Sequence, residues 1–94
     1  MYERVVVGRV DGTAEEIDGA RKMLKSFQNK IPGVLSVSAG VNTIENARYN
    51  WAVVIRFKDK EARELYRTHP LHKLFEDRYG HLLKEATTVE YEID

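Results

Sequence analysis

The 94-residue chain contains no cysteine, so any chemistry that it performs proceeds without a thiol. This absence excludes disulfide bridges, thiolate nucleophiles and zinc sites with thiolate ligands. Only two prolines are present, Pro32 and Pro70, and each is expected to interrupt regular structure. The length leaves room for one hydrophobic core, and we expect a single domain over residues 1–94.

The chain also lacks an excess of charge of either sign and a long apolar run. Fifteen Lys and Arg residues balance fifteen Asp and Glu residues. Because nucleic-acid-binding domains usually carry a basic excess, we do not expect DNA or RNA as a partner. The N-terminal segment MYERVVVGRV has three successive valines between charged residues. We therefore expect no signal peptide, no membrane segment and a cytoplasmic location.

Hydrophobic periodicity predicts a strand and then a helix in the first third of the chain. Residues 2–10 are rich in β-branched side chains, and Asp11-Gly12 is a turn signal. Thr13 and Glu16 have the spacing of a capping box, so a helix should begin there and end at Pro32-Gly33. One apolar stripe runs along this helix: Ile17, Ala20, Leu24, Phe27 and Ile31.

Three later segments alternate in the manner of strands, namely residues 34–41, 51–58 and 87–93. In the first, one face is expected to carry Leu35, Val37, Ala39 and Val41. In the second, one face is expected to carry Trp51, Val53, Ile55 and Phe57. The opposite face of the sheet is expected to hold small or apolar residues: Gly8, Ser36, Ser38, Ala52 and Val54.

Two short helices are predicted before the last strand. Asp59 can cap a helix over residues 60–68, and Pro70 suits the first turn of another. One side of this last helix is expected to carry Leu71, Leu74, Phe75, Arg78 and Leu82. The order of elements is typical of an α+β, ferredoxin-like fold, a four-stranded antiparallel sheet with helices on one face. A second copy packed sheet to sheet is the simplest cover for the other face.

The block Tyr66-x-x-His69-Pro70-x-His72-x-x-Phe75 is similar to that of a known family. With Ile31-Pro32-Gly33-Val34 and Phe57-x-Asp59-x-Glu61-Ala62, it resembles the stress-responsive dimeric α/β-barrel (Dabb) family over about residues 3–93. The resemblance implies a homodimer whose two sheets pack face to face into a dimeric α/β barrel. Most members have no known reaction, and we expect this chain to bind a small apolar or aromatic molecule.

A few plant members of the family are polyketide cyclases, which implies an alternative function for this chain. These enzymes close a ring in a linear poly-β-ketone by aldol condensation and need no metal or organic cofactor. Their reacting pair is the tyrosine and the second histidine of the block, which match Tyr66 and His72 here. An imidazole is suited to act as the base, and a tyrosine hydroxyl can hold the developing oxyanion. A cofactor-free monooxygenase is a second alternative, because antibiotic-biosynthesis monooxygenases share the dimeric barrel.

Two positions depart from the cyclase pattern. Cyclase-like members commonly carry one histidine at the position of Arg4 and another at or next to the position of Trp51. Arg4 can bind a carboxylate or enolate if it points inward, and Trp51 can fill volume that a substrate would occupy. With His69 and Phe75 of the block, these two are the candidate substrate-binding residues.

Each residue of the block also has a structural interpretation. His69 precedes Pro70, so it can be a turn residue that bonds backbone. His72 can bond a neighbouring carbonyl at a helix start, and Tyr66 can be a core residue. A metal held by His69 and His72 is disfavoured because Pro70 breaks the helical register. We expect no metal and no cofactor, while a cation held by backbone carbonyls stays open.

Overall fold

The computed structural model describes residues 1–93, so the end of the predicted domain at residue 94 lies outside the described part. The strands are β1 (Tyr2–Val10), β2 (Val34–Val41), β3 (Trp51–Phe57) and β4 (Leu83–Glu92). The helices are α1 (Ala14–Ser26), α2 (Lys60–Thr68) and α3 (Pro70–Tyr79), and short 3₁₀ turns follow α1 and α3. Within residues 1–93 no helix is long and apolar enough to cross a membrane.

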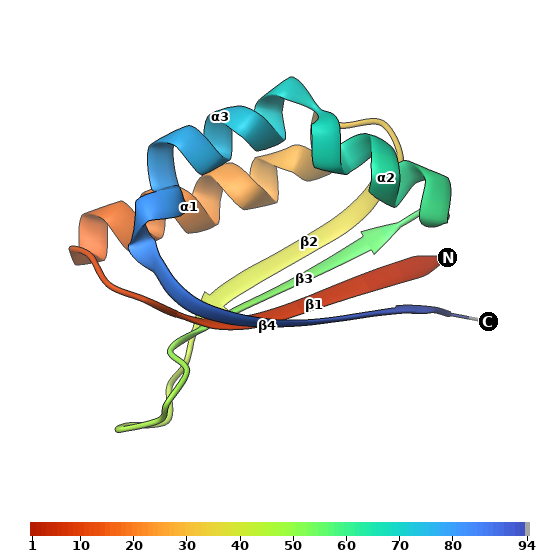
Figure 1. Ribbon diagram of the computed structural model, residues 1–94. Helices are drawn as coiled ribbons and strands as arrows, with labels where there is room; N and C mark the ends of the chain where they lie inside the picture. The colour runs from red at the N-terminus through yellow and green to blue at the C-terminus, as the bar shows by residue number, and fades with distance from the viewer. Residues whose placement is uncertain (94) are drawn as a thin grey trace.

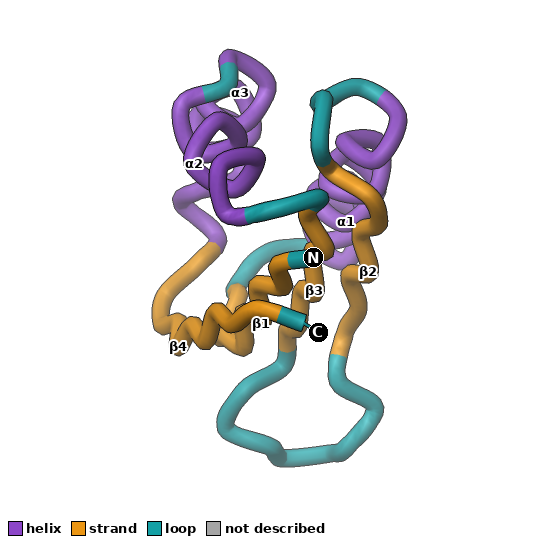
Figure 2. Tube along the Cα trace, turned by 90° about the vertical axis from the view of Figure 1, so that its right-hand side faces the viewer, coloured by secondary structure: helices purple, strands orange, loops and turns teal. Residues whose placement is uncertain are grey.

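The strands form one antiparallel sheet in the order β2-β3-β1-β4. All helices lie on one face of this sheet, and β1 begins at the same end of the molecule at which β4 ends (Figure 1). Viewed from the side in Figure 2, α1 lies above β2, while α2 and α3 lie above the β4 edge. The predicted ferredoxin-like α+β fold is therefore confirmed.

The predicted helix starts are also found, because side chains satisfy the free N–H groups of the first turns. Thr13 Oγ1 accepts from the Glu16 N–H at 3.1 Å, and Glu16 Oε1 accepts from the Thr13 N–H at 2.9 Å. Asp59 Oδ1 accepts from the Ala62 N–H at 2.8 Å. The end of the first helix differs, since α1 ends at Ser26 and a 3₁₀ turn follows it.

Gly33 allows the chain to return from this turn into β2. Its φ is +86°, a conformation that favours glycine. A Cβ atom at this position would lie 2.6 Å from the Cβ of Ala62 in α2. The turn and α2 can therefore approach each other only because residue 33 has no side chain.

The predicted core face of β3 is confirmed: Trp51, Val53, Ile55 and Phe57 are buried. The prediction for β2 is wrong at Leu35. Val34 pairs with Phe57 and Ser36 with Arg56, so Leu35 is an additional residue in a β-bulge. Val34 and Val37 are both buried, whereas Leu35 is 45% exposed and Val41 is 52% exposed at the end of the strand.

Two smaller predictions are also corrected. Leu74 is 39% exposed and Arg78 is exposed as well, because the partly buried side of α3 follows Leu71, Phe75 and Tyr79 at successive intervals of four residues. Gly8 pairs with Trp51, so it belongs to the face under the helices and not to the opposite face.

The open face of the sheet is apolar at its centre. Val5 and Val7 of β1 lie opposite Val54 and Ala52 of β3, and Val5 also lies opposite Val89 of β4. Near one end, Glu3 accepts hydrogen bonds from Arg56, at 3.1 Å from Nη2, and from the Tyr91 hydroxyl. The open face thus has an apolar centre beside a polar group whose hydrogen bonds are satisfied.

Candidate functional site

A cavity of about 310 Å³ lies between the helices and the sheet. Five of the six predicted site residues line it, namely Arg4, Trp51, Tyr66, His72 and Phe75. The remaining wall is mostly apolar. Its apolar residues come from β1, α1, β3, the 3₁₀ turn after α3 and the start of β4: Val6, Val10, Ile17, Ala20, Leu24, Val53, Ile55, Leu82 and Leu83. This cavity, called the helix–sheet cavity below, is of a size that binds small molecules.

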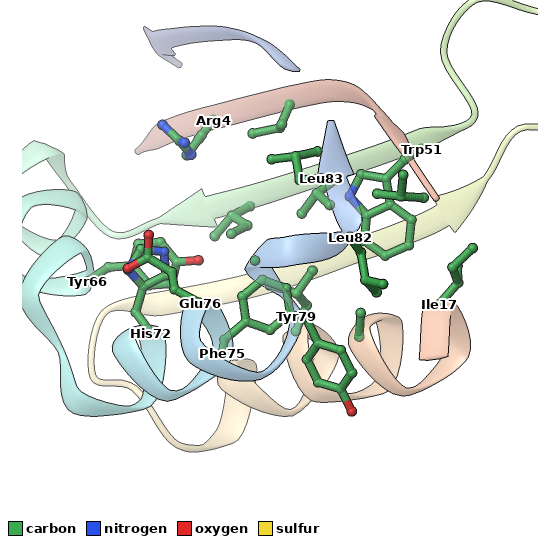
Figure 3. A pocket seen from close by; sticks show the side chains of 17 residues that line it. Arg4, Ile17, Trp51, Tyr66, His72, Phe75, Glu76, Tyr79, Leu82 and Leu83 are labelled. Atoms are coloured by element: carbon green, nitrogen blue, oxygen red, sulfur yellow. The ribbon is translucent and has the colours of Figure 1, made fainter. Parts of the chain in front are cut away.

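The polar and apolar linings of the cavity lie at opposite ends. Figure 3 shows Arg4, Tyr66, His72 and Glu76 at one end, and Trp51 at the other, close to Leu82 and Leu83. The strand register gives the same order, because Arg4 pairs with Ile55 and Gly8 pairs with Trp51. Four residues along a strand span roughly 13 Å.

Tyr66 comes from the last turn of α2 and is 4% exposed. Its ring packs on Phe57, with 5.3 Å between the ring centroids, and on Phe27 at 6.1 Å. The hydroxyl makes no hydrogen bond within residues 1–93. Burial raises the pKa of Tyr66 to about 12, against a smaller lowering by Arg4 and Arg63. At neutral pH the hydroxyl is therefore a hydrogen-bond donor and not a base.

His72 lies in the first turn of α3, and its ring centroid is 4.5 Å from that of Tyr66. Its Nδ1 atom is 3.1 Å from the backbone oxygen of Arg67. A carbonyl oxygen can only accept, so this bond requires the proton on Nδ1. In the neutral ring the lone pair then belongs to Nε2, which has no hydrogen-bond partner within residues 1–93. Glu76 Oε1 lies 3.6 Å from the same Nδ1 atom.

His69 is the one predicted site residue that does not line the cavity. It is the N-cap of α3, and its Nδ1 atom accepts from the Leu71 N–H at 3.1 Å. Its backbone is extended, with φ −65° and ψ 138°, as the following proline requires. The structure therefore gives His69 a capping role, and the chain turns sharply between α2 and α3.

Arg4 is held by an acidic residue that sequence reasoning did not identify. Arg4 Nη1 and Arg63 Nε both donate to Glu90 Oε2, the second at 2.8 Å, and the Tyr2 hydroxyl donates to Glu90 Oε1 at 3.0 Å. Burial raises the pKa of Glu90, but hydrogen bonds from Arg63, Arg4 and Tyr2 outweigh it and hold that pKa below its usual range. Glu90 is therefore ionised at neutral pH.

Sequence spacing alone could have predicted two of the charged residues near the polar end of the cavity, Glu76 and Arg63. Glu76 stands four residues after His72, the spacing at which helical side chains meet. Arg63 stands one helical turn before Tyr66, again on the same side of a helix. Glu90 had no such signal, because only the pairing of β1 with β4 brings it beside Arg4.

Trp51 closes the apolar end of the cavity and is 6% exposed. The preceding residue fixes its position, since the Asn50 side chain accepts from the Val10 N–H at 2.8 Å and donates to the Val10 carbonyl at 2.9 Å. Within residues 1–93 no three His, Asp or Glu side chains gather in a way that could hold a metal ion. The expectation that no metal takes part stays a prediction.

Comparison with known families gives one match over nearly the whole chain. The sequence profile of the stress responsive A/B barrel domain matches residues 6–93. No curated protein matches the sequence.

Solved structures share the fold at low sequence identity. A dimeric protein of unknown function from Bacteroides fragilis is 19% identical with a TM-score of 0.85, over 98% of this chain and 95% of that one. A Dabb family protein from Mesorhizobium loti is 20% identical with a TM-score of 0.81, over 98% and 95% of the two chains. The hydroxynitrile lyase of Passiflora edulis is 15% identical with a TM-score of 0.85, over 99% and 93%.

The buried Tyr66 hydroxyl leads to a prediction about stability at alkaline pH. In the unfolded chain this group loses its proton near pH 10, but in the folded protein it does so only at about pH 12. The stabilisation is complete below pH 10 and is lost as the pH rises towards 12. Over that interval the wild-type free energy of unfolding should fall by about 2 to 3 kcal/mol more than that of Tyr66→Phe.

Urea unfolding followed by circular dichroism at several pH values measures this difference. Between pH 7 and 9 the gap between the two proteins should stay constant, which is the internal control. If the free energies of unfolding of the wild type and Tyr66→Phe fell in parallel above pH 10, burial would not raise the pKa of the Tyr66 hydroxyl.

Proposed function

Because the chain belongs to the stress responsive A/B barrel domain family, we propose that it binds a small apolar or aromatic molecule in the helix–sheet cavity. The observation that carries this proposal is the cavity itself, about 310 Å³ with a mostly apolar wall and a polar group of side chains at one end. Protein interiors are normally close-packed, so a space of this size beside a well-packed core favours a ligand site.

A neutral apolar dye tests this proposal. N-phenyl-1-naphthylamine fluoresces strongly in apolar sites, and Trp51, the only tryptophan, lies in the cavity wall and reports binding independently. We expect saturable binding to the wild type at micromolar concentrations. The variant Val6→Phe adds a ring to the cavity wall and should weaken binding at least about tenfold, since the dye and the new ring compete for one space.

Val6→Ile is the matched control, because it adds a single methylene and should leave the affinity within about threefold. Equal dye binding by the wild type and a folded Val6→Phe would place the dye elsewhere and count against the cavity. No saturable binding to the wild type would overturn the proposed function.

We further propose that two copies associate through the open faces of their sheets. No helix covers the apolar centre of that face, with Val5, Val54 and Val89, and the loop between β2 and β3 only borders it. Contiguous exposed apolar surface usually marks an interface. The related protein from Bacteroides fragilis is dimeric. A self-complementary arrangement about a two-fold axis is the commonest way to cover such a face.

Val54→Arg is expected to dissociate this dimer. Val54 lies on the inner strand β3 at the apolar centre of the open face, so in the proposed dimer its arginine replacement would be a buried charge without a partner, which costs several kcal/mol. Light scattering after size-exclusion chromatography should give twice the monomer mass for the wild type and the monomer mass for the variant. Leu65→Arg is the control, because Leu65 is 62% exposed on α2 and its replacement should leave the dimer intact.

An enzyme of the polyketide cyclase type is the second candidate function. It is favoured by the proton on His72 Nδ1, which leaves Nε2 as the basic atom, and by the protonated Tyr66 hydroxyl beside it. The base would remove a proton from an activated methylene, and the hydroxyl would donate to the developing oxyanion. No similar observation favours the cofactor-free monooxygenase, which stays an alternative prediction.

Nonane-2,4,6,8-tetraone tests this chemistry, since its intramolecular aldol closure with loss of water gives an aromatic ring that absorbs in the ultraviolet. If the chain is a cyclase, the wild type accelerates ring closure and His72→Ala lowers the rate by roughly 10² to 10⁴. Tyr66→Phe should lower it as well, and both variants should still bind N-phenyl-1-naphthylamine. A wild-type rate equal to that of the buffer would leave binding as the function.

A further inference from the structure

The cluster of Arg4, Arg63 and Glu90, beside the polar end of the helix–sheet cavity, holds two positive charges and one negative charge. Arg4 and Arg63 share the carboxylate of Glu90, and both donate to the same oxygen. The side chains are largely buried, with exposures of 26% for Arg4, 13% for Arg63 and 22% for Glu90. Charges in such positions are normally paired one to one, so one positive charge of this cluster lacks a counterion within it.

Unused hydrogen-bond donors accompany this charge. Each guanidinium carries five N–H donors, and within residues 1–93 Arg4 uses only Nη1. Arg63 Nη1 is buried and has no hydrogen-bond partner in this part of the chain. Glu76, the other acidic group at this end, has a side chain that is 62% exposed and lies against His72. An ionised oxygen on a ligand at Arg4 would supply the counterion that the cluster lacks.

Arg4 is the member of the pair that faces the ligand space. It lines the cavity, whereas Arg63 and Glu90 do not. The opposite end, at Trp51, is apolar and lies roughly 13 Å away along the sheet, as the strand rise gives. The space therefore suits a molecule about 10 Å long with one anionic end and one apolar end.

We propose that the helix–sheet cavity selects a monocarboxylate with an apolar body, its carboxylate bound by Arg4 and its apolar end against Trp51. This inference rests on the proposed small-molecule function and narrows it to a class of ligand. Arginine is suited to the role because its planar fork pairs with a carboxylate through two parallel hydrogen bonds. Glu90 acts as the resident counterion that competes for Arg4.

A matched pair of ligands tests the inference on the wild-type protein. 4-Butylbenzoic acid and 4-butylbenzamide have nearly the same shape, and only the acid is ionised at pH 7.5. Each is titrated against the protein with bound N-phenyl-1-naphthylamine, and Trp51 emission gives a second readout. The acid should displace the dye at a concentration at least about tenfold lower than the amide, because a hydrogen-bonded charge pair favours it.

Variants identify the residue that makes the distinction. Arg4→Gln should bring the acid and the amide to within about threefold of each other. Arg9→Gln is the matched control, since it removes an arginine from the same strand that does not line the cavity, and should keep the preference. Glu90→Gln should increase the preference for the acid several-fold, a gain that misfolding cannot produce.

The outcomes separate the two proposals. If the dye binds and the two ligands displace it equally, the carboxylate inference is overturned and the proposed function stands. If the preference for the acid survives in a folded Arg4→Gln, the inference is overturned as well. If Arg4→Gln does not fold, the wild-type comparison and Glu90→Gln decide. If the dye does not bind at all, the proposed function fails and the inference fails with it.

Discussion

The packing of three aromatic rings at one end of the molecule holds the helices on the sheet. Phe27 and Phe57 have no exposed surface, and the ring of Tyr66 lies against both. These contacts join the turn after α1, the end of β3 and the end of α2. Since this end of the layer is solid, the remainder can stay open as a cavity while the helices keep their positions. Phe75 extends the same packing along α3, with its ring 6.2 Å from that of Phe27.

The break between α2 and α3 brings two residues of the sequence block, Tyr66 and His72, together in the cavity wall. In one continuous helix, Tyr66 and His72 would lie about 120° apart around the axis and would face different surroundings. Pro70 prevents that helix, and His69 caps the new one with its own ring. The chain therefore changes direction, and the two rings meet with 4.5 Å between their centroids. The first histidine of the block shapes the backbone, and the second lines the cavity.

Features that depend on neighbours in sequence could be predicted, whereas those that depend on strand register could not. The caps at Thr13 and Asp59 require only the residues that follow them, and both were found. The exposure of Leu35 results from a bulge in the pairing of β2 with β3, which alternation within β2 does not encode. Likewise, Arg4 could be expected in the cavity, but its partner Glu90 is 86 positions away and is placed there only by the β1–β4 register.

Trp51 closes one end of the cavity, and its partner in the sheet is Gly8, where a Cβ atom would lie 2.6 Å from the Glu85 carbonyl oxygen and 3.0 Å from the Leu83 side chain of β4. The length of the cavity is thus set by one large side chain at the end remote from Arg4, Tyr66 and His72. Exchanging that side chain for a smaller one would accommodate longer molecules and leave the polar end unchanged. Cavity length and the chemistry of the polar end are therefore set by different residues, so a substitution at one end can leave the other end unchanged.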